Sequence, residues 1–159
     1  MIAVVDSSPL IVLAKSGYLG LLPQLFDTIL MPPAVFAEIT AQPRRAGAEQ
    51  IAELAWLRLT SVRDHTRLDR LRRRLDPGEA EVIALGEEVT AHMVVLDDLP
   101  GRREAAARGL TIVGTAGLAV MAKREGLVPL ARPLIDDFIR AGLFLRSDLY
   151  QGLIQTANE

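Results

Sequence analysis

The feature that most constrains the fold is a regular alternation of short apolar segments with longer amphipathic ones. The short, β-branched runs cover residues 2–5, 28–31, 59–62, 93–96 and 110–113. Segments with helical spacing of apolar residues separate them, and one has a strong helix start in Asp76-Pro77-Gly78-Glu79. Short buried strands that alternate with helices indicate a parallel sheet covered on both faces.

The segments between the strands predict the helices. We expect them over residues 10–15, 34–41, 48–57, 67–75, 77–88, 102–108, 117–124, 130–141 and 148–156. Gly17, Pro43 and Gly109 are expected to end three of them. The chain is therefore predicted to be one α/β domain, residues 1–159, a three-layer α/β/α sandwich around a parallel sheet of roughly four to five strands.

Composition excludes several classes of protein. Half of the 159 residues are apolar but only 4% are aromatic, which predicts an ordered, aliphatic core. There is no cysteine, so disulfides and thiolate metal sites are excluded and a cytoplasmic location is expected. The first residues lack the basic region of a signal peptide, and no apolar stretch reaches the ~20 residues that cross a bilayer.

Net charge does not by itself indicate a nucleic-acid partner, because it is −2. Arginines nevertheless gather in residues 63–74, at Arg44 and Arg45, and at Arg102 and Arg103. Arg102, Arg103 and Arg73 are the candidates for contacts with a phosphate backbone, since such contacts supply affinity without reading sequence. The alternative for the 63–74 cluster is a solvated helix face, opposite its leucines.

Acidic residues follow two of the predicted strands directly. Asp6 comes after the first strand, and Asp97 and Asp98 come after the strand at 93–96. In open α/β sheets, ligands bind outside the carboxyl ends of the strands. If these strands are neighbours, the carboxylates converge at one edge of the sheet.

Helices can bring further acids to the same edge. Glu38 shares a helical face with Val35, and Glu79 shares one with Val82. Glu81 falls on another face of its helix and is expected to be more exposed. Carboxylates forced together repel one another unless a cation is present, and oxygen ligands suit Mg²⁺ or Mn²⁺. Such a metal activates water and stabilises charge on a phosphate.

Each acid also has a structural explanation. Asp6, or either aspartate of the later pair, could cap the helix that follows it. Asp76 and Glu79 fit a capping box. Glu38 could be a solvated helix residue. The two histidines, His65 in a predicted polar turn and His92 before a strand, are expected to be surface residues.

These residues also resemble the successive motifs of PIN domains. The resemblance lies in residues 4–11 (VVDSSPLI), 32–39, 76–85 (DPGEAEVIAL), 96–103 (LDDLPGRR) and the 114–118 turn. It is closest to a subgroup of short prokaryotic PIN-like proteins. The motifs are short, but four in the right order are fairly specific.

The resemblance implies a doubly wound fold and Mg²⁺- or Mn²⁺-dependent cleavage of single-stranded RNA. Many small members of the family are toxins of toxin–antitoxin pairs, so an antitoxin partner and a homodimer are expected. By matching positions, the implied catalytic residues are Asp6, Glu38, Glu79 and Asp98. The implied metal ligands are Asp6, Asp98, Asp97 and Glu79. The supporting residues are Ser8, which would orient the first aspartate, Glu81 and Thr115.

Two departures from the typical toxins bear on activity. Their third acid is usually aspartate, whereas this chain has Glu79. The tail beyond Pro129 extends past the ordinary core, so we divide the domain into a core of about 1–128 and a helical extension of about 129–159. The extension could complete the core, form a dimer face or receive an antitoxin segment.

Two other functions remain open from the sequence. One is a PIN-like domain without turnover that binds nucleic acid or protein. The other is a receiver-like phosphoacceptor module, which would use paired aspartates with Mg²⁺. A receiver needs its acid pair after the first strand, whereas here the pair, Asp97 and Asp98, follows a later one.

Overall fold

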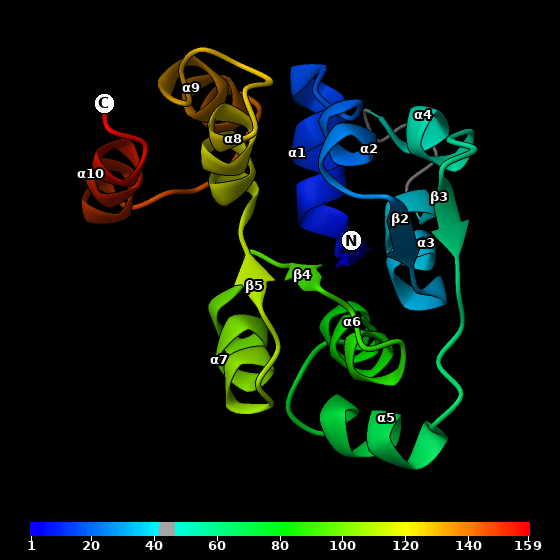
Figure 1. The fold of residues 1–159 in the computed structure, drawn as a ribbon. Coiled ribbons are helices and arrows are strands. Elements are labelled where there is room, and N and C mark those ends of the chain that lie inside the picture. The colour runs from blue at the N-terminus through cyan, green and yellow to red at the C-terminus, as the bar shows by residue number, and fades with distance from the viewer. Residues whose placement is uncertain (42–46) are drawn as a thin grey trace.

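The protein is a five-stranded parallel sheet with helices packed against it, as seen in a computed structural model that describes residues 1–41 and 47–159 (Figure 1). The strand order is β3-β2-β1-β4-β5. The strands are β1 (Ile2–Val5), β2 (Thr28–Met31), β3 (Leu57–Leu59), β4 (Met93–Val95) and β5 (Ile112–Val113). The predicted three-layer α/β class is confirmed. The expected stop at Pro43 and the pair Arg44 and Arg45 lie outside the described residues.

The helices that join the strands cover both faces of the sheet. They are α1 (Ser7–Ser16), α2 (Leu21–Leu25), α3 (Pro33–Thr40), α4 (Ala48–Ala52), α5 (His65–Arg72), α6 (Pro77–Glu88), α7 (Leu99–Ala107), α8 (Thr115–Arg124), α9 (Arg132–Arg140) and α10 (Ser147–Thr156). Helices α1, α2 and α8 lie on one side of the sheet, and α6 lies on the other with α5 and α7 (Figure 1). The chain passes from β1 to β2 and β3 on one side of the sheet and then returns to β4 and β5 on the other, so the order reverses between β1 and β4.

Some boundaries differ from the predicted ones. The helix expected over 48–57 ends at Ala52, and the third strand is Leu57–Leu59 instead of 59–62. The register is set by pairing with β2, which aligns Leu57 with Ile29 and buries Leu57. His65 begins α5 instead of lying in a turn, because Asp64 caps that helix by accepting from the Arg67 N–H at 3.0 Å. The short helix α2 was not predicted.

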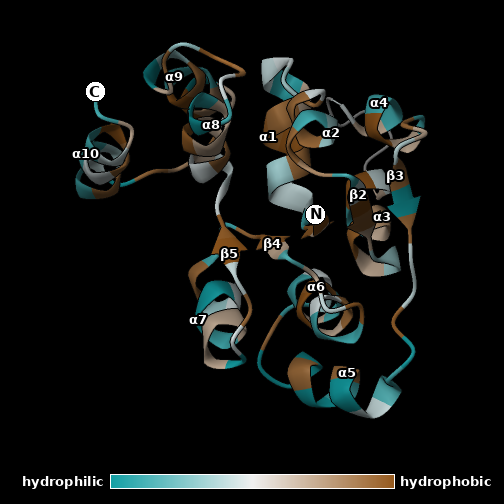
Figure 2. Cartoon of the chain, in the orientation of Figure 1, coloured by the Kyte–Doolittle hydropathy of each residue, from teal (hydrophilic) through white to brown (hydrophobic). Residues whose placement is uncertain are grey.

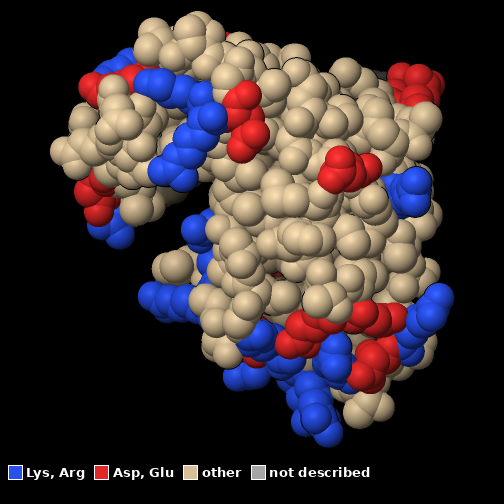
Figure 3. Space-filling view, in the orientation of Figure 1, with Lys and Arg blue, Asp and Glu red and all other residues tan. Residues whose placement is uncertain are grey.

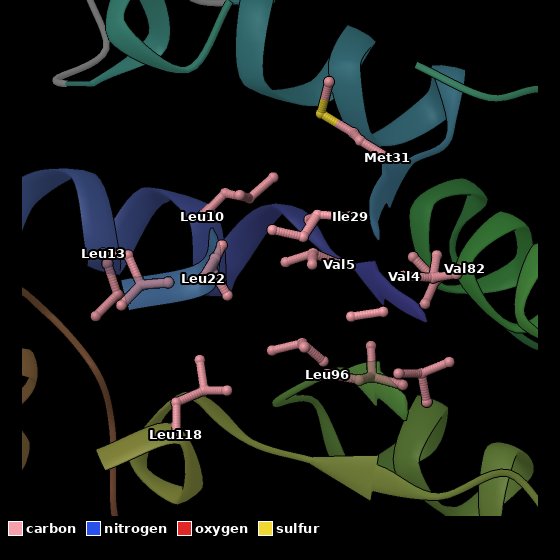
Figure 4. Close-up of a cluster of buried hydrophobic side chains, with 14 of the residues drawn as sticks. Val4, Val5, Leu10, Leu13, Leu22, Ile29, Met31, Val82, Leu96 and Leu118 are labelled. Carbon is pink, nitrogen blue, oxygen red and sulfur yellow. The ribbon is translucent and has the colours of Figure 1, made fainter. Parts of the chain in front are cut away.

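The core is aliphatic, as the composition predicts. Leu10 and Leu13 of α1, Leu22 of α2 and Leu118 of α8 meet on one side of the strands (Figure 4). Strands β2, β4 and β5 and the middle of α1 are hydrophobic, whereas β3 and much of α5 are hydrophilic (Figure 2). Burial of each leucine stabilises the fold by about 1.5–3 kcal/mol.

The C-terminal helices add to this core. Helix α9 packs against α1 and α8, and α10 packs against α8. Ile135 and Phe138 are fully buried, and the Phe138 ring meets Tyr18 edge-on with 5.7 Å between centroids. Glu159 accepts hydrogen bonds from the backbone N–H of Ala131 and from Lys123. The described residues include no helix long and apolar enough to cross a membrane.

Candidate metal centre

The centre begins where β1 and β4 end side by side. Val5 is aligned with Val95, and the Asp6 N–H continues the ladder by donating to the Val95 carbonyl at 3.0 Å. Asp6 is only 4% exposed, and its carboxylate accepts a 2.8 Å hydrogen bond from the Ser7 N–H. It therefore caps α1, as its position before that helix predicts, and its carboxylate also faces the neighbouring acids described next.

The N-terminus of α6 brings two more carboxylates to this edge. Asp76 caps the helix by accepting from the Glu79 N–H at 2.8 Å, with Pro77 in the first turn. Oxygen atoms of Asp76, Glu79 and Asp98 all lie within 4.8 Å of one another. The end of β4 and the start of α6, distant in sequence, thus supply one acidic cluster.

Gly78 marks the place where the cluster reaches Asp6 and Glu38. A Cβ atom at this position would lie 3.2 Å from Glu38 Oε2, 3.3 Å from Asp6 Oδ1 and 3.6 Å from Asp76 Oδ1. Glycine at this position therefore lets three carboxylates approach the backbone more closely than a larger side chain would allow. The acidic centre comprises Asp6, Glu38, Asp76, Glu79 and Asp98.

The acids of this centre raise one another's proton affinity. Burial raises the pKa of Asp6 to about 7, and the negative charges of Glu38, Asp76 and Glu79 add to the effect. Burial likewise raises the pKa of Glu79 to about 7, with Asp76 and Asp98 contributing. Ionised carboxylates this close are unfavourable alone, and a divalent cation would offset their repulsion.

The donor set fits a hard metal ion. All the groups are carboxylates, which suits Mg²⁺ or Mn²⁺ and does not suit a zinc site of the Cys/His type. The close approach of three carboxylates at Gly78 and the raised pKa of two buried acids are both features that bound cations would account for. Exposed edges at Glu38, Asp76 and Asp98 leave the centre accessible from solvent.

Asp97 lies beside this centre but has other partners. Its carboxylate accepts 2.8 Å and 2.6 Å hydrogen bonds from the N–H and hydroxyl of Thr115. Burial raises its pKa, and those two bonds and the nearby Arg102 counteract that rise. Asp97 thus ties the N-terminus of α8 to the end of β4, and Thr115 acts through it.

Glu81 is buried, at 7% exposure, so the expectation that it is more exposed was wrong. Its carboxylate accepts a 2.6 Å hydrogen bond from the Ala34 N–H in the first turn of α3 and pairs with Arg72 at 3.3 Å. The physical reason is that α3 and α5 both pack against α6, which leaves little of that helix in solvent. Glu81 orients α3, the helix that carries Glu38.

The remaining residues of the predicted site, three arginines and Ser8, differ in their exposure and their hydrogen bonds. Arg102 donates to the Leu96 carbonyl at 2.8 Å and is half-buried, whereas Arg103 and Arg73 are exposed. Ser8 lines a hollow that Asp97 and Asp98 also line, and the hydrogen bond to Asp6 comes from the neighbouring Ser7 N–H.

Comparison with protein families decides the assignment. A family model described as a PIN domain matches residues 2–159, nearly the whole chain. The chain belongs to the PIN-domain family. PIN domains are in general metal-dependent nucleases, and the acidic centre of this PIN domain agrees with that chemistry. Neither the comparison with curated proteins nor the comparison with solved structures finds a match.

Sequence reasoning missed Asp76 as a member of the centre. Its position predicts only a helix cap, and it does cap α6. Its spacing was the available signal. Asp76 lies within one helical turn of Glu79 and two residues before Gly78, the glycine around which the acids gather. One carboxylate can both cap a helix and face a cation, because it has two oxygens.

The contacts of Asp97 give a first testable prediction. We expect Asp97→Ala to lower the free energy of unfolding by about 2–4 kcal/mol, because it leaves the Thr115 N–H and hydroxyl without their acceptor. Asp97→Asn keeps an acceptor oxygen and should lose much less. Urea unfolding measures both, with Asp148→Ala on the exposed start of α10 as the control. Equal losses in the alanine and asparagine variants would contradict this role.

Proposed function

We propose that this PIN domain is a metal-dependent endoribonuclease that cleaves phosphodiester bonds of single-stranded RNA, with Mg²⁺ or Mn²⁺ as cofactor. The observation that carries the proposal is the convergence of Asp6, Glu38, Asp76, Glu79 and Asp98 at the carboxyl edge of the sheet. The centre is formed by four separate segments, each with its own reason to place an acid there.

The chain's residues divide into ligands and positioning groups. Asp6, Glu79 and Asp98 would hold the metal directly, and Asp76 and Glu38 lie close enough to complete the set. The bound metal supplies a Lewis acid that activates water and neutralises charge developing on the phosphate.

Positioning is provided by hydrogen bonds around the ligands. The Ser7 N–H holds the Asp6 carboxylate, and Glu81 holds the first turn of α3, which carries Glu38. Asp97 fixes the loop that carries Asp98, because it is bonded to Thr115 on the neighbouring α8. We assign Asp98 as the ligand of the pair and Asp97 as a positioning residue.

Exposed basic residues close in sequence to the acids of the centre favour an anionic substrate. Arg103, in the middle of α7, is exposed and follows Asp98 by five residues. Many arginines of the 63–74 cluster are instead engaged in ion pairs: Arg67 with Glu87 at 3.3 Å, and Arg74 with Glu104 at 3.1 Å. Acidic and basic side chains are accordingly mixed over α5–α7 (Figure 3). Arg103 and Arg73 are therefore the stronger candidates for phosphate contacts.

We further propose that the chain acts as one domain, residues 1–159, with its core at about 1–128 and its extension at about 129–159. A toxin role in the cytoplasm, with an antitoxin partner and a homodimeric state, rests on the family resemblance. Exposed Leu130, Ile139 and Leu149 on the extension provide apolar surface for such contacts. Light scattering that gives a monomeric mass would contradict the dimer.

A catalytically silent PIN domain that binds nucleic acid or protein is the second candidate. The glutamate at position 79, where the toxins usually have aspartate, is the observation that favours it. A receiver-like module does not agree with the fold, because receivers have strand order 2-1-3-4-5 and this sheet has β3-β2-β1-β4-β5.

Cleavage of a labelled single-stranded RNA by the purified protein tests the proposal. We expect fragments with Mg²⁺ or Mn²⁺ and none with EDTA. A folded protein that binds Mn²⁺, as measured by calorimetry, yet cleaves no RNA of mixed sequence would favour the silent domain.

A further inference from the structure

A hollow of about 440 Å³ opens beside the acidic centre and is shared between α1, the start of α7 and the segment after α9. Asp97 and Asp98 line one end of it. A second hollow, of about 430 Å³, is lined by Glu38 and Asp76. Acids of the centre thus line both depressions, so an RNA strand bound in either one would lie next to them.

One wall of the first hollow is a single face of α1. Ser8, Ile11, Val12 and Lys15 line it, at spacings of three and four residues that place them on one side of the helix. Seven residues of α-helix span about 10 Å. One strand of stacked nucleic acid advances about 3.4 Å per nucleotide, so this wall is long enough for two or three nucleotides.

The far end of this wall carries a positive charge. Lys15 is exposed in the last turn of α1, and none of the ion pairs of the described residues includes it. Lys15 therefore lies about 10 Å along α1 from Ser8, a distance that suits contact with a phosphate two or three nucleotides further along the RNA.

The aromatic residue Phe144 also lines the hollow. Phe144 is 87% exposed, although the other large aromatic of this region, Phe138, is fully buried. The two residues before it are held by the end of α9, because the Leu143 N–H donates to the Phe138 carbonyl at 2.9 Å and the Gly142 N–H donates to the Ile139 carbonyl at 3.0 Å. A ring exposed on an anchored backbone can receive a base by stacking with little loss of conformational entropy.

From these observations we propose that the hollow is an RNA subsite in which Phe144 stacks on a base and Lys15 contacts a phosphate of a nucleotide flanking the scissile bond. This inference rests on the proposed nuclease function and adds its substrate positioning. Continuity with the acidic centre and the cation at the far end favour a polyanion with flat bases over a protein segment. Ser8 and Asp98 mark the end of the subsite next to the chemistry.

Binding of a fluorescein-labelled ten-nucleotide single-stranded RNA tests the subsite. Fluorescence anisotropy in Ca²⁺, which occupies oxygen sites, separates affinity from turnover. We expect Phe144→Ala to weaken binding roughly tenfold and Phe144→Trp to preserve it. Lys15→Gln should reduce the slope of log K against log salt concentration by about 0.7, and Lys15→Arg should restore it.

Matched controls lie outside the hollow. Leu59→Ala removes another exposed apolar side chain, at the end of β3, and Arg124→Gln removes a cation at the end of α8. Neither variant should change RNA affinity. In cleavage assays with Mn²⁺, Phe144→Ala should raise KM with little change in kcat, which a merely structural defect would not do selectively.

The outcomes separate the two proposals. A wild-type protein that cleaves and binds RNA while Phe144→Ala and Lys15→Gln behave identically to it would overturn the subsite and leave the nuclease intact. If RNA binding and cleavage are unchanged but Phe144→Ala alters the oligomeric mass, the hollow takes part in protein association. That outcome would also overturn the RNA subsite. A wild-type protein that neither binds nor cleaves RNA would overturn both.

Discussion

Asp6→Asn is expected to abolish metal-dependent RNA cleavage and, at the same time, to stabilise the metal-free protein. Asparagine keeps an oxygen that can accept from the Ser7 N–H, so the cap of α1 survives. The substitution also removes a buried negative charge, which the neighbouring acids make unfavourable. The proposed metal centre loses one of its ligands at the same time. Because changes even to groups behind the ligands typically weaken metal affinity 10–100-fold, we expect a loss of cleavage of at least about a hundredfold.

The two effects are measured together by thermal unfolding and by RNA cleavage. Wild-type protein should gain thermal stability on addition of Mg²⁺ or Mn²⁺, since a ligand that binds only the folded state stabilises it. Without metal at pH 8, Asp6→Asn should melt at a higher temperature than the wild type. Addition of Mg²⁺ or Mn²⁺ should raise the melting temperature of this variant only a little. Asp69→Asn, on the exposed face of α5, is the control and should behave as wild type. A variant destabilised without metal would contradict the electrostatic account of the centre.

The stability of the metal-free protein is expected to fall as pH rises from about 4 to about 8. In the folded state the pKa of Asp6 is raised from 3.8 to about 7 and that of Glu79 from 4.5 to about 7. The unfolded chain releases these protons at the ordinary values, so their contribution is complete below pH ~4 and is lost as pH passes through about 7. For Asp6 alone the difference corresponds to about 4 kcal/mol.

Metal ions should remove most of this pH dependence. Chemical denaturation at intervals between pH 5 and pH 8, with EDTA or with Mg²⁺, measures the free energy of unfolding in both states. We expect the stabilisation by Mg²⁺ to grow with pH, because protons and metal compete for the same carboxylates. A metal-free protein whose stability is flat across this range would show that the acids of the centre do not interact as the geometry indicates.

Several members of the acidic centre were expected from local sequence. Asp6 and the pair Asp97 and Asp98 were predicted from their positions after apolar strands, because parallel strands end at the same edge of the sheet. Glu79 was predicted from its helical face. These inferences need only periodicity and the direction of the strands, which are local properties of the chain.

Other parts depended on which elements become neighbours. Glu81 was expected to be more exposed, and only the packing of α3 and α5 on α6 shows that it is buried and holds the first turn of α3. Asp97 and Asp98 are adjacent in sequence and could not be told apart, yet one contacts Thr115 and the other lies with Asp76 and Glu79. For two adjacent residues in a loop, no helical or strand periodicity predicts the direction of each side chain.

The sequence by itself determined the fold class, the aliphatic core and the acids at the strand ends, because each depends on hydrophobic periodicity and turn residues within a short segment. The tertiary structure alone decided the register of β3, the membership of Asp76 in the centre and the hollow between α1 and Phe144. Those features arise from contacts between segments far apart in the chain. Their free energies come from packing and from charges brought together in space, which no local pattern of residues encodes.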